Sequence, residues 1–198
     1  PTSGGAVQTL RRAMISSQLL RGSHFVSIAA VNGACAGAGL AWAAACDLRV
    51  ASDSALFRAG FLTAGLSGDF GGTWTLPRVV GAAKAREMYL LNEKVRSAEA
   101  LRIGLVSKVF PAAEFRAAVD GIAHALAAAP PLALKRIKAN FNDADRLSFA
   151  EHLDAEAERH TRCGYHPDAV EAGRAFMTKT TPTFLGLPKR ASWELSKL

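Results

Sequence analysis

The sequence predicts an α/β fold with a helical C-terminal region. An apolar strand at Ile28–Val31 is followed by a glycine-containing turn, residues 32–37, and by an alanine-rich helix at about 38–45. The strand is apolar throughout rather than alternating, which is typical of a sheet covered on both faces. Beyond residue 111 the apolar residues recur with helical spacing. We therefore expect an α/β core in residues 1–110 and a helical region in residues 111–198.

The other elements follow from periodicity and from stop signals. The first helix carries its apolar residues on one side, with Arg11 and Arg12 off it, and ends at Gly22. Ser97 is a good N-cap, and Pro130 with Pro131 separates two of the C-terminal helices. Further strands are expected at 47–51, 55–58 and 105–110. The expected helices are 6–20, 38–45, 82–91, 97–103, 112–129, 132–141, 148–163 and 167–177, with a helical turn at 76–80.

The start of helix 38–45 is the first candidate binding site. The residues that enter it are almost all Gly or Ala, so a ligand can approach the backbone closely. The first amides of a helix have no intrahelical acceptor and lie at the positive end of its dipole. They can therefore bind an anion, or an oxygen that becomes anionic during a reaction.

Three other interpretations of this stretch compete. Residues 25–46 carry no charge, and Gly33 and Gly37 have the small-xxx-small spacing of transmembrane helices. Polar Ser27 and Asn32 weaken that interpretation. The second interpretation is a nucleotide-binding loop, but the spacing of Gly33, Gly37 and Gly39 matches neither of the two common loop motifs. Close packing of a small-residue helix on a sheet remains open.

Composition favours a cytoplasmic globular protein. The chain has 198 residues, of which 49% are hydrophobic and 21% charged, which suits one domain with a substantial core. Its three cysteines are odd in number and include no Cys-x-x-Cys pair, so we expect reduced thiols and no metal site. No signal peptide is recognisable. Because the chain opens on Pro1, with a helix and no strand before the central stretch, we expect that an N-terminal part is missing.

The net charge of +7 does not indicate a nucleic-acid partner by itself. The basic residues are scattered along the chain and are not interleaved with aromatic residues, so nucleic-acid binding is not the expectation. A polyanionic small ligand, such as a nucleotide-containing cofactor, would use the same surplus, and a solvated surface is the default.

Several motifs, in order along the chain, resemble the enoyl-CoA hydratase/isomerase (crotonase) family. They are Ala-Ala-Val-Asn-Gly at 29–33 with Gly37-Ala-Gly39, the run 45–51, Gly-Gly-Thr-Trp-Thr-Leu-Pro-Arg-Val-Val-Gly at 71–81, the run 100–111, and Pro-Thr-Phe-Leu-Gly at 182–186. The resemblance runs from about residue 6 to residue 186. It implies a crotonase-like ββα spiral core with a helical C-terminal trimerisation region. The family's first ββα units, with one of its two oxyanion-hole amides, have no counterpart here.

What the resemblance implies is chemistry on an acyl-CoA thioester, with coenzyme A as part of the substrate and no further cofactor. The second amide of the oxyanion hole falls on Ala38. The residues implied to surround the substrate are Ala36, Gly37, Ala41, Gly60, Phe61 and Leu66. Family members assemble as homotrimers or hexamers, and Phe184 and Lys189 are implied to reach the adenine or phosphates of coenzyme A. No membrane contact is expected.

The acid/base residues depart from the hydratase pattern. The two glutamates of the hydratases correspond to Ala41 and Phe61, neither of which can transfer a proton. Asp69 remains, at a position where acyl-CoA isomerases of the family carry an aspartate. We therefore expect Asp69 to move a proton along the acyl chain, its pKa raised by apolar neighbours. As an alternative, Asp69 is only a helix N-cap.

Two alternatives to an isomerase stay open. One is a hydratase that uses another acid/base group, and the other is a non-catalytic relative that binds acyl-CoA or RNA. The small side chains of Ala36, Ala38 and Ala41 favour a bulky acyl group.

Overall fold

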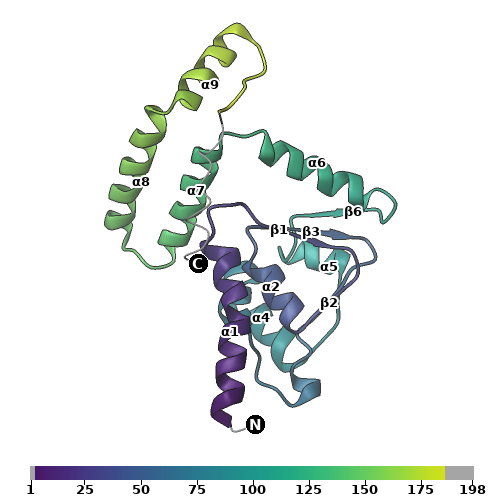
Figure 1. Cartoon of the computed structure of the whole chain (residues 1–198). Helices are drawn as coiled ribbons and strands as arrows, with labels where there is room; N and C mark the ends of the chain where they lie inside the picture. Colours follow the sequence, from purple (N-terminus) through teal and green to yellow (C-terminus); the bar gives the residue numbers. More distant parts are fainter. Residues whose placement is uncertain (1–2, 186–198) are drawn as a thin grey trace. The chain divides into compact units, whose positions relative to one another are not determined.

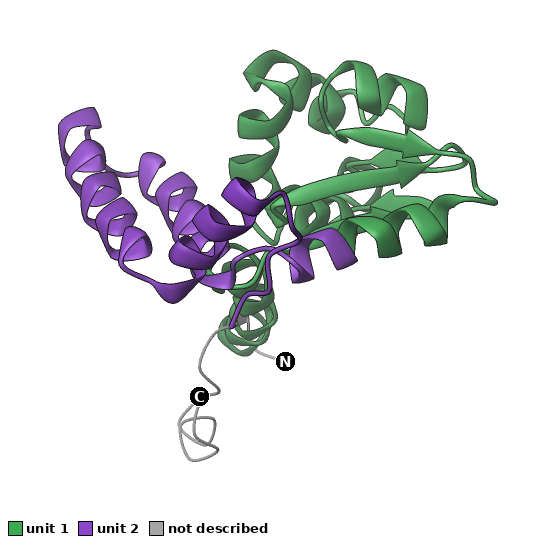
Figure 2. Ribbon diagram, turned by 90° about the horizontal axis from the view of Figure 1, so that it is seen from above, with its two compact units in different colours: residues 1–123 green, residues 124–198 purple. Residues whose placement is uncertain are grey.

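The computed structural model describes residues 3–185. The chain divides into two compact units, unit 1 with residues 1–123 and unit 2 with residues 124–198 (Figures 1 and 2). The boundary predicted at residues 110/111 lies before helix α6, Phe115–Ala127, whereas the observed division falls inside this helix. Each unit has its own packing and is described separately.

Unit 1 contains two three-stranded sheets. One has the order β1-β3-β6 and is parallel throughout, and the other has the order β2-β4-β5, in which β4 and β5 are antiparallel. The strands are β1 Ile28–Val31, β2 Ala34–Ala36, β3 Leu48–Ser52, β4 Leu56–Arg58, β5 Val95–Arg96 and β6 Lys108–Phe110. The α/β prediction is confirmed.

Helices cover these sheets, and α2 lies at the centre of their packing (Figure 1). It contacts α1, α3 and strands β1 and β2, while α3 in turn packs on α4. The helices are α1 Ser3–Gly22, α2 Ala38–Ala45, α3 Gly72–Val80, α4 Ala82–Leu90, α5 Ser97–Arg102 and α6 Phe115–Ala127, with a short 3₁₀ helix at Leu62–Ala64. Leu40, Phe57, Leu76, Met88 and Leu105 are almost fully buried and form the centre of the core.

Several details of the prediction are wrong: strand β5 was not predicted, and α3 begins at Gly72 rather than at residue 76. Three further errors have a cause in the structure. The turn expected at 32–37 contains strand β2, which three small residues form by pairing with β4. The strand expected at 105–110 begins only at Lys108: Leu105 and Val106 are apolar because they fill the core, not because they pair in the sheet. The helix expected at 112–129 begins at Phe115, because the amide of Glu114 closes a turn onto the carbonyl of Pro111.

The membrane interpretation of residues 25–46 is also wrong, since they fold as two strands and the eight-residue α2. Between residues 3 and 185, no single helix has both the length and the apolar character needed to cross a bilayer. Helices α6 and α7, the latter Pro131–Ala144, meet that criterion only when joined across the break between them.

Unit 2 consists of the end of α6 and of α7 Pro131–Ala144, α8 Phe149–Gly164 and α9 Pro167–Thr178. Pro131 opens α7, where the missing N–H is not needed. Ser148 and Glu151 form a capping box at the start of α8, and the His166 ring accepts a hydrogen bond from the amide of Asp168 at the start of α9. Helix α8 contacts both α7 and α9.

Candidate active site

The entrance to α2 has a backbone that only glycine adopts easily. Gly37 has φ +56° and ψ −124°, and its N–H is shared between the carbonyls of Arg58 and Ala59 at N···O distances of 3.2 and 3.0 Å. This arrangement ties the turn to the end of β4. Ala38, half-buried, is the first residue of α2, so its N–H has no acceptor within the helix.

The segment after β4 lies against this turn. Gly60 has φ +77°, and its N–H donates to Oδ1 of Asn92 at 2.8 Å. Phe61 is 7% exposed, and the edge of its ring lies 3.8–3.9 Å from the point where a Cβ on Gly37 would stand. Of the predicted substrate-site residues, Ala36, Gly37, Gly60 and Phe61 are therefore neighbours.

Tyr89 of α4 joins this group, and the sequence analysis missed it. Its ring stacks on Phe61, with centroids 6.0 Å apart and an interplanar angle of 10°. A Cβ on Gly68 would lie 3.3 Å from the tyrosine ring, and one on Gly72 would come closer than 3.0 Å to the hydroxyl. The same Cβ on Gly72 would meet Ala41 at 3.0 Å. No local pattern in the sequence singles out Tyr89, because α4 also carries Lys84, Arg86 and Glu87 and the place of the tyrosine depends on how the helix packs.

Asp69 lies in the loop between the 3₁₀ helix and α3. Its Oδ1 is buried and has no hydrogen-bond partner, and burial raises the pKa of this carboxyl. The alternative that Asp69 caps α3 is wrong: the N-cap is Gly71, and no side chain caps that helix. Only the backbone carbonyl of Asp69 takes part, accepting from the amide of Gly72 at 3.2 Å.

Phe70 anchors the loop that carries Asp69. It has φ +50°, a conformation that is strained for a bulky residue, and it is followed by Gly71 at φ +76°. The Phe70 ring packs edge-on against Trp42 of α2, with centroids 5.0 Å apart. Its carbonyl accepts a hydrogen bond from Ser17 of α1 at 2.9 Å. Contacts from two helices thus hold the loop in an unusual conformation directly after Asp69.

Asp69 and Tyr89 influence each other without a hydrogen bond between them. The Tyr89 hydroxyl is buried and has no partner. Burial first, and then the negative charge of Asp69, raise the pKa of this tyrosine. At the pH where Asp69 titrates, Tyr89 is neutral, so it places no charge beside the carboxylate.

The remaining predicted residues are less informative. Leu66 is 61% exposed, and its amide donates a hydrogen bond to the carbonyl of Phe61. Phe184 is half-buried and belongs to unit 2, and Lys189 lies outside the described residues. In the described part of the chain, no group of three or more His, Cys, Asp or Glu side chains gathers as a metal site would. Cys35 is buried, which raises its pKa to about 11.

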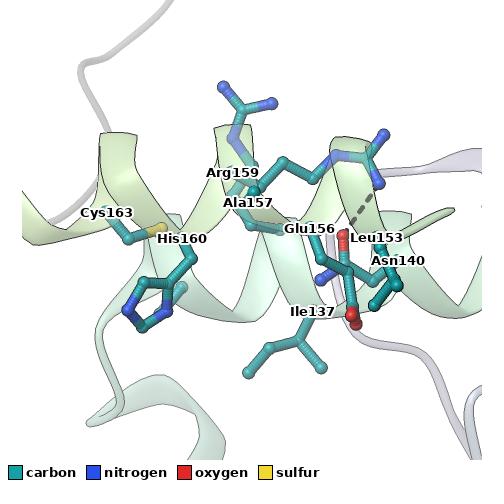
Figure 3. A pocket seen from close by; sticks show the side chains of 10 residues that line it. Ile137, Asn140, Leu153, Glu156, Ala157, Arg159, His160 and Cys163 are labelled. Carbon is teal, nitrogen blue, oxygen red and sulfur yellow. Dashed lines mark hydrogen bonds between the residues drawn. The ribbon is translucent and has the colours of Figure 1, made fainter. Parts of the chain in front are cut away.

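Unit 2 has a hollow of its own, of about 540 Å³, between α7 and α8. Ile137 and Leu153 give it an apolar wall, and His160 and Cys163 lie at one end (Figure 3). Arg159 donates a hydrogen bond to Asn140 across it, at 2.8 Å. The sequence analysis did not predict this hollow.

Comparison with known proteins identifies the family. The model of the enoyl-CoA hydratase/isomerase family matches residues 8–187. The chain is 39% identical over 159 residues to a protein of Rhodobacter capsulatus named "Probable enoyl-CoA hydratase", covering 80% of this chain and 62% of the relative. It is 35% identical over 159 residues to the 1,2-epoxyphenylacetyl-CoA isomerase of Escherichia coli, covering 80% and 61%. The chain thus spans about three fifths of the length of these curated relatives.

A solved structure agrees with the sequence comparisons. An enoyl-CoA hydratase from Polaromonas superposes with a TM-score of 0.88 at 33% identity, over 92% of this chain and 71% of that one. The crotonase-type α/β fold with its helical C-terminal region, predicted from the motifs, is confirmed. The chain belongs to the enoyl-CoA hydratase/isomerase family.

Proposed function

We propose that the chain acts on an acyl-CoA thioester as an isomerase, with Asp69 as the group that moves the proton. The observation that carries this proposal is the buried, unpartnered Oδ1 of Asp69, whose pKa burial raises. A carboxyl with a raised pKa is better matched to accepting and returning a proton near neutral pH.

The proposed reaction has two steps and no net gain of atoms. Asp69 takes a proton from a carbon of the acyl chain, and the electron pair of that C–H bond moves through the conjugated system onto the thioester oxygen. The N–H of Ala38 donates to this oxygen while it is negative. The electron pair then returns, and Asp69 delivers the proton to a different carbon, so the double bond has moved.

The absence of hydratase glutamates supports an isomerase over a hydratase. At the corresponding positions, Ala41 is fully buried and Phe61 packs against Gly37 and Tyr89. Neither side chain can transfer a proton. Relatives named as hydratases and as an isomerase are both similar to this chain, so a hydratase that uses another acid/base group is the second candidate. The small side chains beside Ala38 favour a bulky acyl group.

The proposed assembly is a homotrimer or hexamer in the cytoplasm, with coenzyme A bound only as part of the substrate. Large apolar side chains on the unit 2 helices support self-association: Phe141, Phe149 and Phe176 are 74%, 78% and 83% exposed. Light scattering after size-exclusion chromatography would test this, since a monomer at micromolar concentration contradicts it.

The decisive experiment compares the unaltered chain with Asp69→Asn in deuterated water. Both receive 2-enoyl-, 3-enoyl- and dienoyl-CoA thioesters, and mass spectrometry follows deuterium uptake and double-bond position. We expect double-bond migration without a gain of water, reduced by a factor of about 10² to 10⁴ in Asp69→Asn. Asp154→Asn, an exposed carboxylate of α8, is the matched control and should leave the rate unchanged.

Each other result points to a named alternative. Hydrated product that persists in Asp69→Asn would mean that a different group supplies the acid/base chemistry. Intact acyl-CoA binding without turnover in either protein would indicate a non-catalytic relative. Binding of RNA that weakens with salt and is unaffected by the substitution would indicate the RNA-binding alternative.

A further inference from the structure

We propose that Tyr89 belongs to the same site, and that its hydroxyl and Oδ1 of Asp69 together bind one O–H group, which is either a water molecule or a hydroxyl on the acyl chain. The inference rests on the proposed function, because it extends the site around Asp69. It assigns to Tyr89 a role in binding and specificity, not in proton transfer.

The first argument is that both atoms lack a partner. Buried polar side-chain atoms almost always have a hydrogen-bond partner, and those that lack one require an explanation. Two such atoms occur on neighbouring elements here, the Tyr89 hydroxyl on α4 and the Asp69 Oδ1 on the loop before α3. The tyrosine lies against Gly68 and Gly72, on either side of Asp69 in the sequence, although no hydrogen bond joins the two groups. A third group between them would satisfy both.

The second argument is that the tyrosine hydroxyl is held in place. Its ring stacks on Phe61 and lies against Gly68, while the hydroxyl lies over Gly72. These two glycines flank Asp69 in the sequence, one residue before it and three after it. The absence of a Cβ at Gly72 leaves the room that the hydroxyl occupies. Tyr89 is therefore directed at the same short loop that presents the carboxylate.

The third argument is chemical complementarity. A neutral phenol donates one hydrogen bond, and an ionised carboxylate only accepts. A group that accepts from Tyr89 and donates to Asp69 must carry both an oxygen lone pair and a proton, as water and alcohols do. A methylene group can satisfy neither atom, so the pair discriminates between hydroxylated and unsubstituted acyl chains, or else holds a water molecule.

The test substitutes Tyr89→Phe, which removes one oxygen atom and keeps the stacked ring. Tyr165→Phe is the matched control, because Tyr165 is the chain's other tyrosine and is 87% exposed. Two readouts that do not depend on turnover are measured. One is the titration of Asp69 by ¹³C-carboxylate NMR, with the signal assigned by its loss in Asp69→Asn. The other is the affinity for a 3-hydroxyacyl-CoA and for the saturated acyl-CoA of the same length.

If a water molecule is the ligand, Tyr89→Phe raises the pKa of Asp69 in the free protein, since the donor that supports its charge through the water is lost. If an acyl hydroxyl is the ligand, Tyr89→Phe weakens the 3-hydroxyacyl-CoA about tenfold and leaves the saturated thioester unchanged, as expected for one hydrogen bond. Both results support the proposal and distinguish the two sources. Unchanged titration together with unchanged affinities would overturn it.

Failure of this proposal is distinguishable from failure of the proposed function. Activity lost in Asp69→Asn but unaltered binding and titration in Tyr89→Phe would leave the isomerase proposal standing and make Tyr89 a packing residue. Conversely, the titration and affinity results remain interpretable even where no double bond migrates. Thermal unfolding of Tyr89→Phe shows whether the variant is folded. Phe61→Leu removes the aromatic ring that stacks on Tyr89 but no polar atom, so it separates the effect of lost packing from the effect of the lost hydroxyl.

Discussion

Asp69 in unit 1 has one buried carboxylate oxygen and Asp143 in unit 2 is buried as a whole residue, and the surroundings of the two carboxylates are opposite. Asp143, 6% exposed, receives hydrogen bonds from Arg146, with Oδ1 at 2.9 Å from Nε and 2.5 Å from Nη2, and from Arg159 on α8. The Arg159 hydrogen bond, followed by that of Arg146, outweighs burial and lowers the pKa of Asp143. Oδ1 of Asp69 has no partner, and burial raises its pKa.

The difference separates a structural carboxylate from a candidate functional one. Asp143 is a buried carboxylate that accepts hydrogen bonds from two guanidinium groups, and its bond to Arg159 joins α7 to α8. Both of its oxygens already have partners within the protein. A carboxylate with one buried, unpartnered oxygen disfavours its own ionised form, and a fold tolerates this cost where the group serves another purpose. Substitutions of Asp143 and Asp69 test this contrast, and Gly72→Ala tests the packing of the site that contains Asp69.

The largest effect on stability is expected for Asp143→Ala. It leaves Arg159, whose side chain is only 18% exposed, without its carboxylate partner. Breaking a buried pair by removing one member typically costs about 3 kcal/mol or more of unfolding free energy. Urea unfolding should show this loss. The matched control is Arg116→Ala, which removes an exposed pair with Asp120 and should cost less than about 1 kcal/mol. Equal losses would contradict the contrast.

The sequence alone could predict the fold around Asp69 and the candidate role of Asp69, but not which side chains surround it. The motifs determine the fold because glycines and small residues at fixed spacings reflect backbone requirements, such as the positive φ of Gly37. They also drew attention to Asp69. They did not reveal Tyr89, because its relation to Asp69 depends on how α4 packs on α3, and such packing leaves no local pattern in the sequence.

Elements with weak local signals were misassigned for a similar reason. Strand β2 has three small residues and β5 only two, one of them a charged arginine, so pairing partners rather than propensity create both strands. The cap interpretation of Asp69 rested on its position before a helix, but the N-cap of α3 is Gly71, which has a left-handed conformation.

A smaller effect is expected for Gly72→Ala, which tests how closely the site is packed. The new methyl group would come closer than 3.0 Å to the Tyr89 hydroxyl and to 3.0 Å from the side chain of Ala41. Overpacking of this kind typically costs about 1–3 kcal/mol, against a gain of less than about 1 kcal/mol from the helix propensity of alanine. We expect a net loss of unfolding free energy, measured by urea titration.

Two variants sharpen that result. Gly121→Ala on α6, where no atom lies within 4 Å of the added carbon, should be neutral or slightly stabilising. In the Tyr89→Phe background, Gly72→Ala should cost less than in the unaltered chain, because the hydroxyl that obstructs the methyl group is gone. Additive losses in the double variant would mean that the hydroxyl does not occupy this space.

The smallest effect is expected for Asp69→Asn on stability, and its sign distinguishes Asp69 from Asp143. Burial raises the pKa of Asp69 above its usual value of 3.8, so between these two values the folded chain binds more protons than the unfolded chain. The unfolding free energy therefore falls as the pH rises through this window and stays lower above it. The asparagine side chain is never charged, so Asp69→Asn should be more stable than the unaltered chain at pH 7 and equal to it in acid below the window.

For Asp143 the lowered pKa reverses the sign, and Asp143→Asn should be less stable than the unaltered chain at pH 7. Thermal unfolding of both variants from pH 3 to pH 7 measures the two trends. A stability loss in Asp69→Asn that grows toward neutral pH would show that the Asp69 carboxylate is satisfied within the fold, which would remove the physical basis for its proposed role.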